Sequence, residues 1–188
     1  MILLTGFEPF TTGQGLELSH NPTADIVRRV SERLPGSEYA VLPVSYARTR
    51  AALEERFRAL NPRVWIGLGY APHRTTLDIE TLAVNMEHAV RGDNDGAQPW
   101  MRAIVRDAPA AYRGRINMES AIEAFAQHGV EAVPCFHAGT FLCNQTFYLG
   151  CHHCEGSASM ELAAFIHVPP MEDYADFEAG LRTLILSL

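Results

Sequence analysis

The alternation of short apolar runs with amphipathic stretches restricts the fold of this chain more than any other feature. Apolar runs of strand length occur at Met1–Thr5, Tyr39–Val44, Val64–Gly69, Thr76–Val84, Ala132–Phe136 and Leu162–Val168. Stretches with helical spacing lie at about 21–34, 48–60, 117–128, 143–153 and 173–188. Such alternation is typical of a parallel or mixed sheet flanked by helices. We predict an α/β fold, a three-layer α/β/α sandwich around a twisted, mostly parallel sheet, with 85–116 less regular.

The length and composition narrow the class of protein. A chain of 188 residues, 47% hydrophobic and 20% charged, suits one globular domain, so we expect 1–188 to form a single catalytic domain. A net charge of −7 argues against binding nucleic acid. All 15 basic residues are arginine, which excludes a lysine nucleophile. No stretch is apolar for long enough to span a membrane, and the start, MILLTGFEPF, does not resemble a secretory signal. We therefore expect a cytoplasmic protein with reduced cysteines.

Cys143 lies in the most informative run, AGTFLCNQTFYLG at 138–150. A glycine turn precedes the cysteine, and the residues after it have the pattern of a helix. The unpaired N–H groups and positive dipole at a helix N-terminus favour a thiolate and can hold an oxyanion. A small buried cysteine is an equally simple interpretation of this run.

Two further residues complete a possible catalytic set. His167 stands near the end of the last apolar strand, where ligands bind in open α/β sheets. Glu80 is an acid within the apolar run LDIETLAV and could orient the imidazole. Taken singly, His167 could be a core histidine bonded to a backbone carbonyl, and Glu80 could face solvent from an edge strand. Taken together with Cys143, the two residues favour a thiol hydrolase.

The cluster Cys151, His152, His153 and Cys154 suggests a second kind of site. Neighbouring ligands cannot all converge on one face of a helix, and Cys135 and Cys143 do not supply the usual second pair of a zinc site. We expect the two cysteines to pack in the helix and no metal to bind. A metal-binding or redox-sensing module is kept as the alternative of another class.

Phe7 and Phe10 follow the first strand and could line a pocket or belong to the core.

Several motifs, taken together, resemble those of the pyroglutamyl peptidase I family (pyrrolidone-carboxylate peptidases), which are cysteine peptidases. The resemblance spans the chain: LLTGFEPF near the start, NPT at 21–23, LPVSY at 42–46, GYAPHR at 69–74, AVN at 83–85, DNDG at 93–96, APAAY at 108–112, AGTFLCN at 138–144 and FIHVPP at 165–170.

The resemblance implies a catalytic triad of Glu80, Cys143 and His167. It also implies an omega-peptidase that removes the N-terminal pyroglutamyl (5-oxoproline) residue from small peptides through a thioester acyl-enzyme. The side chains of Phe7, Phe10, Phe141 and Leu142 would enclose the lactam ring, and the backbone at Tyr70 would hydrogen-bond it. The family needs no cofactor and often forms homo-oligomers, which implies a homotetramer here.

The chain departs from the family pattern in three places. Thr81 follows Glu80 where an arginine is usual, and Thr11-Thr12 replaces a glycine pair. An arginine near the family's active site falls on Val90, while Arg91 stands one position later. A basic side chain at a shifted position could favour another acyl group. A related thiol hydrolase acting on an acidic or open-chain N-acyl group is therefore an alternative within the enzyme class.

Overall fold

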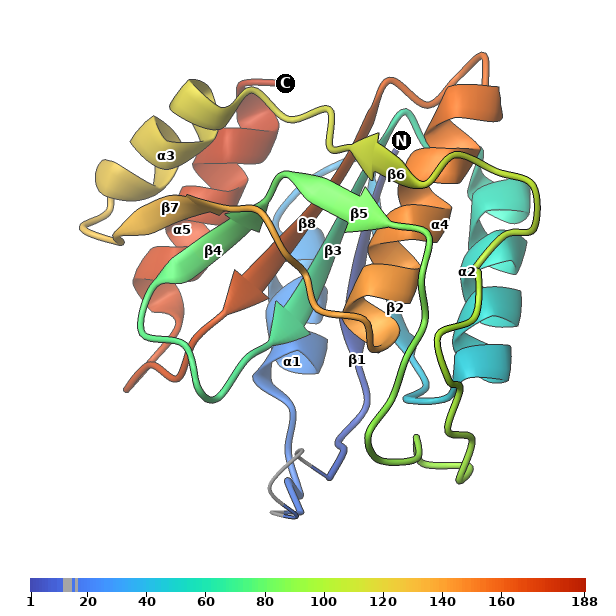
Figure 1. Cartoon of the computed structure of the whole chain (residues 1–188). Coiled ribbons are helices and arrows are strands. Elements are labelled where there is room, and N and C mark those ends of the chain that lie inside the picture. The colour runs from blue at the N-terminus through green and yellow to red at the C-terminus, as the bar shows by residue number, and fades with distance from the viewer. Residues whose placement is uncertain (12–14, 16) are drawn as a thin grey trace.

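The computed structural model describes residues 1–11, 15 and 17–188, so Thr12 lies outside the described residues. Figure 1 shows helices on both faces of a central sheet. The strands are β1 (Ile2–Phe7), β2 (Ser37–Leu42), β3 (Val64–Tyr70), β4 (Leu77–Glu80), β5 (Leu82–Val84), β6 (Ala111–Arg113), β7 (Ala132–Cys135) and β8 (Leu162–Val168). The helices are α1 (Pro22–Glu32), α2 (Tyr46–Leu60), α3 (Met118–Ala126), α4 (Leu142–Gly156) and α5 (Ala175–Leu186).

Six strands form the central sheet in the order β2-β1-β3-β8-β4-β7. The pairs β1–β2, β1–β3, β3–β8 and β4–β7 are parallel, and β4 runs antiparallel to β8. Helices α1, α3 and α5 cover one face, while α2 and α4 cover the other (Figure 1). The predicted three-layer sandwich with a mostly parallel sheet is confirmed.

Local sequence signals explain where several helices begin. The side chain of Asn21 caps α1 by accepting from the Thr23 N–H at 3.2 Å, and Pro22 occupies the first helical position. Ser45 caps α2 and Asn117 caps α3 in the same way. Among the described residues, no helix is both long and apolar enough to cross a lipid bilayer.

The expected strand over Thr76–Val84 is wrong in one respect, because the chain changes partners at Thr81. Strand β4 pairs with β7 and β8, whereas β5 leaves the sheet and pairs with β6 in a separate antiparallel ribbon. Thr81 itself donates from its N–H to the Cys135 carbonyl at 2.7 Å and accepts from the Gly114 N–H at 3.0 Å. The alternating pattern continues through both strands, so periodicity alone does not reveal the break.

A second correction concerns the connection to Cys143. The sequence predicts a tight turn between a strand and the helix, but residues 136–141 separate β7 from α4. Since β7 is parallel to β4 and β4 is antiparallel to β8, this segment carries the chain back along the sheet. It returns the N-terminus of α4 to the edge where β3 and β8 end (Figure 1).

Candidate active site

Cys143 is the second residue of α4 and lies on the wall of a cavity of about 400 Å³. Its side chain is half-buried, so a ligand in the cavity can reach the sulfur. The residue before the helix, Phe141, makes no side-chain cap hydrogen bond. The N–H groups of the first turn have no partner within the helix, so they are available to an oxygen atom bound beside the sulfur.

His167 and Glu80 form a buried pair on neighbouring strands. Nδ1 of His167 lies 2.7 Å from Oε1 of Glu80, and the two residues are 5% and 0% exposed. Strand β4 lies between β8 and β7, so Glu80 is not on an edge strand with a solvated face. The interpretation of His167 as a core histidine bonded to a carbonyl is also wrong, because its partner is a carboxylate. A carboxylate bonded to Nδ1 leaves Nε2 as the nitrogen that can exchange protons.

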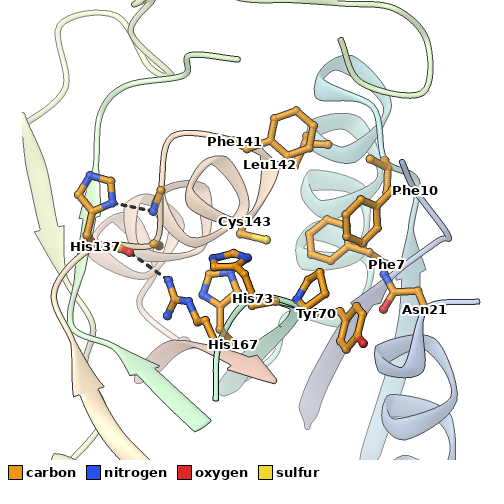
Figure 2. Close-up of a pocket in the computed structure, with 16 residues that line it drawn as sticks. Phe7, Phe10, Asn21, Tyr70, His73, His137, Phe141, Leu142, Cys143 and His167 are labelled. Carbon is orange, nitrogen blue, oxygen red and sulfur yellow. Dashed lines mark hydrogen bonds between the residues drawn. The ribbon is translucent and has the colours of Figure 1, made fainter. Parts of the chain in front are cut away.

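Gly69 on β3 makes room for the sulfur and the imidazole side by side. A Cβ atom at Gly69 would lie 2.9 Å from Cys143 Sγ and 3.0 Å from His167 Cδ2. Both atoms therefore border the same small volume above β3, and Figure 2 shows Cys143 above His167. The glycines at 67 and 69 are visible in the sequence, but the sequence does not show that the sulfur of Cys143 and the imidazole of His167 occupy the space that a side chain at Gly69 would fill.

Burial is the largest cause of the pKa shifts of Cys143 and His167. It raises the pKa of the Cys143 thiol to about 12, with a smaller increase from Glu80 and an opposing effect of Arg74. It lowers the pKa of His167, although Glu80 opposes that shift. Both directions favour a neutral thiol beside a neutral imidazole. The helix N-terminus favours a thiolate, whereas burial of the two groups shifts both pKa values toward the neutral pair.

Arg74 is a member of the site that the sequence analysis did not single out. Its Nη1 donates to Glu80 Oε1 at 2.9 Å and also to Asp78, and its Nη2 donates to the His137 carbonyl at 3.3 Å. The side chain is 16% exposed. The residue was visible in the motif GYAPHR, but its contacts depend on how β4 and the segment after β7 meet, which no local pattern reveals.

All five residues predicted to bind the substrate line the same cavity as Cys143 and His167, namely Phe7, Phe10, Tyr70, Phe141 and Leu142. Figure 2 shows Phe7, Phe10 and Tyr70 on one side of the sulfur and His137 on the other. Asn21, His73 and His137 also line the cavity and were not predicted. The aromatic rings thus gather on one side of the sulfur, together with Asn21, while His137 lies on the other side (Figure 2).

Asn144 and Gln145 anchor the helix directly behind the cysteine. Asn144 is fully buried, accepts from the Val84 N–H at 3.0 Å, and donates to the carbonyls of Val84 and Met86 at 2.9 Å. Gln145 donates to the Tyr46 carbonyl at 3.2 Å and to Glu87 at 3.1 Å. These bonds fix the first turn of α4 against the β5 segment and thereby the direction of the Cys143 side chain.

The cluster at the other end of α4 does not converge on a common point. Cys154 donates to the Met160 carbonyl, His152 bonds the Tyr112 hydroxyl at 2.8 Å, and His153 stacks on Phe57. Within the described part of the chain, no three His, Cys, Asp or Glu side chains are grouped so that they could hold a metal ion. Cys151 packs in the hydrophobic core, so each of the four side chains has a packing or hydrogen-bonding partner of its own.

Arg91, which stands one position after the place of the family's arginine, is not in the lining of the cavity. Val90 is 82% exposed, and a Cβ atom at Gly15 would lie 2.9 Å from Nη1 of Arg91, which places that guanidinium against Gly15. Neither residue is among the described residues that line the cavity. The departure at this position therefore adds no basic side chain to the lining of the cavity.

The comparison with known proteins bears directly on this geometry. The family model described as pyroglutamyl peptidase matches residues 1–184. The chain belongs to the pyroglutamyl peptidase family. This membership confirms the resemblance found in the sequence and makes the protein a cysteine peptidase of the pyroglutamyl-peptidase I type.

Individual relatives agree with the family match. The chain is 32% identical over 190 residues to a pyrrolidone-carboxylate peptidase of Bacillus thuringiensis (strain Al Hakam), covering 99% of this chain and 86% of the relative. It is 34% identical over 175 residues to that of Thermococcus litoralis, with coverages of 92% and 77%. A structure of a mutant pyrrolidone carboxyl peptidase from Pyrococcus furiosus superposes with a TM-score of 0.89 at 28% identity, covering 98% and 96%.

Proposed function

We propose that Cys143, His167 and Glu80 hydrolyse the bond that joins an N-terminal pyroglutamyl residue to the rest of a peptide. The observation that carries this proposal is the buried 2.7 Å contact of His167 with Glu80. That pair lies beside a cysteine at a helix N-terminus, within a largely apolar cavity. A nucleophile, a base and a group that orients the base are the three parts that acyl transfer requires.

Acylation begins from the neutral pair. As the Cys143 sulfur attacks the pyroglutamyl carbonyl carbon, Nε2 of His167 takes the thiol proton and Glu80 stabilises the imidazolium. The carbonyl oxygen becomes an oxyanion, which the Cys143 N–H at the start of α4 holds. The imidazolium then gives the proton to the leaving nitrogen. The C–N bond breaks, the shortened peptide leaves with a new amino group, and a thioester remains.

Deacylation repeats the sequence with water. His167 takes a proton from a water molecule as its oxygen attacks the thioester carbonyl, and the C–S bond then breaks. The proton returns to the sulfur, and free pyroglutamate leaves. No step requires a metal ion or an organic cofactor, since the nucleophile and the base are both side chains of this protein.

The aromatic side of the cavity accounts for the choice of a lactam. A pyroglutamyl ring carries no charge and has one N–H and one C=O, so it can be enclosed by Phe7, Phe10, Phe141 and Leu142 while the Tyr70 backbone pairs with its polar atoms. An acidic acyl group would place a charge among these aromatic rings, and an open-chain acyl group such as acetyl would leave part of the space for the ring unfilled. The lactam is therefore the acyl group that we propose, ahead of the alternative acyl substrates.

Release of a chromophore from a pyroglutamyl amide tests the proposal. We expect Cys143→Ala to lower kcat/KM by at least about a thousandfold, because the nucleophile is removed. The matched control Cys154→Ala removes a thiol at the far end of the same helix and retains activity. Full activity in Cys143→Ala would end the proposal. Equal cleavage of acetyl or glutamyl amides by the wild-type protein would favour the alternative acyl substrates instead.

We further propose that 1–188 acts as a single catalytic domain in the cytoplasm and assembles into a homotetramer. Four free cysteines suit a reducing compartment. Exposed apolar side chains at Val90, Trp100, Met101 and Phe136 suit contacts between copies. Light scattering after size-exclusion chromatography measures the assembly, and a strictly monomeric mass would contradict it.

A further inference from the structure

Glu80 has an unusual set of hydrogen bonds for the carboxylate of a proposed triad. Its Oε1 accepts both bonds, from His167 at 2.7 Å and from Arg74 at 2.9 Å. Its Oε2 is buried and has no hydrogen-bond partner among the described residues. Apart from the imidazole that it is meant to orient, the carboxylate is therefore held by Arg74.

Arg74 also reaches the segment that forms the opposite wall of the cavity. While Nη1 contacts Glu80, Nη2 donates to the carbonyl of His137 at 3.3 Å. His137 in turn accepts from the Gly139 N–H through Nδ1 at 2.9 Å, and both residues line the cavity (Figure 2). One planar guanidinium thus joins β4, which carries the acid, to the segment that leads into Cys143.

We propose that Arg74 is a positioning residue for the reaction, a two-nitrogen clamp that sets the Glu80 carboxylate and the 136–141 wall relative to each other. This inference rests on the proposed function of Glu80 and His167. The fork geometry of the guanidinium matters, because its two nitrogens make bonds in different directions from one rigid plane. The ammonium group of lysine could pair with Glu80 but could not also reach the carbonyl of His137 in the same arrangement.

The charges around the imidazole give the proposal a second readout. Glu80 and Asp78 face His167 from β4, Arg74 faces it from the preceding turn, and Cys143 lies on α4. The positive charge of Arg74 lowers the pKa of His167. Removing that charge therefore raises this pKa. Because His167 must be neutral to accept the thiol proton, the acidic limb of kcat/KM moves to higher pH.

The test compares Arg74→Gln and Arg74→Lys on a pyroglutamyl amide. For Arg74→Gln, we expect kcat to fall about 10- to 100-fold, KM to rise, and the acidic limb to shift upward. For Arg74→Lys, we expect kcat and KM to change in the same directions, while the acidic limb stays near that of the wild type because the charge is kept. Arg58→Gln, at an exposed arginine on α2, is the matched control and leaves all three unchanged.

Thermal melting followed by circular dichroism separates this role from a merely structural one. If Arg74→Gln does not fold, Arg74→Lys carries the test alone. Folded variants with wild-type kcat and KM overturn the clamp, even if their melting temperature is lower. The clamp is also overturned if kcat and KM change in Arg74→Gln but not in Arg74→Lys, since a positive charge at this position would then be enough for full activity. Loss of the proposed function itself would show separately, as an inactive wild-type protein or an active Cys143→Ala variant.

Discussion

Gly69→Ala is a perturbation that tests directly whether Cys143 and His167 work together. The substitution adds one methyl group on β3. Glycine at this position is not required by the backbone, since Gly69 is not among the residues with a positive φ. The added Cβ would lie 2.9 Å from Cys143 Sγ, 2.9 Å from Phe165 Cε1 and 3.0 Å from His167 Cδ2.

The expected losses of stability and of kcat follow from these distances. Carbon atoms pack best at about 3.5–4.0 Å, so the neighbours must move by about 0.5–1 Å. Overpacking of this kind costs about 1–3 kcal/mol of stability. A misplacement of about 1 Å in reacting groups can lower the rate by about 100-fold. We therefore expect kcat on a pyroglutamyl amide to fall by about 10- to 100-fold in a protein that remains folded.

The assay measures kcat and KM well below the melting temperature, with circular dichroism as a check on folding. Gly156→Ala is the matched control, because a Cβ there meets no atom within 4 Å and its φ is not positive. A folded Gly69→Ala protein with the kcat of the wild type would refute the reasoning. The sulfur and the imidazole would then not need the space above β3.

Three further predictions concern protonation, packing and metal. Because burial lowers the pKa of His167, we expect the acidic limb of kcat/KM to have its midpoint below pH 6.5. Because burial raises the pKa of the Cys143 thiol, we expect thiolate absorbance to stay flat from about pH 6 to about pH 9. A thiolate signal in that range would contradict the neutral thiol and imidazole. Asn144→Ala takes the hydrogen-bond partner from the partly buried Val84 N–H and Met86 carbonyl, and we expect it to lower the free energy of unfolding by about 1–3 kcal/mol in urea titration. A loss below about 0.5 kcal/mol would show that these bonds matter little. Dialysis against a chelator leaves kcat/KM unchanged, whereas a loss of activity that zinc restores would point to a metal site.

Much of the fold could be predicted because its signals are local. Apolar runs of strand length and capped amphipathic stretches depend on neighbours within a few residues, so most helices and strands were placed near their observed bounds. The prediction of one strand from Thr76 to Val84 was wrong because its outcome depends on contacts that are distant in sequence. Whether a strand continues or changes partner at Thr81 depends on β6 and β7, which are distant in sequence.

The proposed triad could be named from the residues because each member was chemically unusual for its place. Cys143 followed a glycine turn at the start of a helical pattern, Glu80 was an acid in an apolar run, and His167 stood at the end of a strand. The sequence could not show that Arg74 holds Glu80 or that Gly69 gives room to the sulfur. Both facts arise where segments far apart along the chain meet.

The amino-acid sequence by itself determined the layered α/β class, the family and the residue types available for acyl transfer. Only the tertiary structure decided how the thiol and the imidazole are buried and which groups lie beside them. The helix N-terminus that the sequence predicts favours an anion, but folding also takes the imidazole and much of the thiol out of water. Desolvation depends on everything that packs around a group, and here it is the largest cause of both pKa shifts.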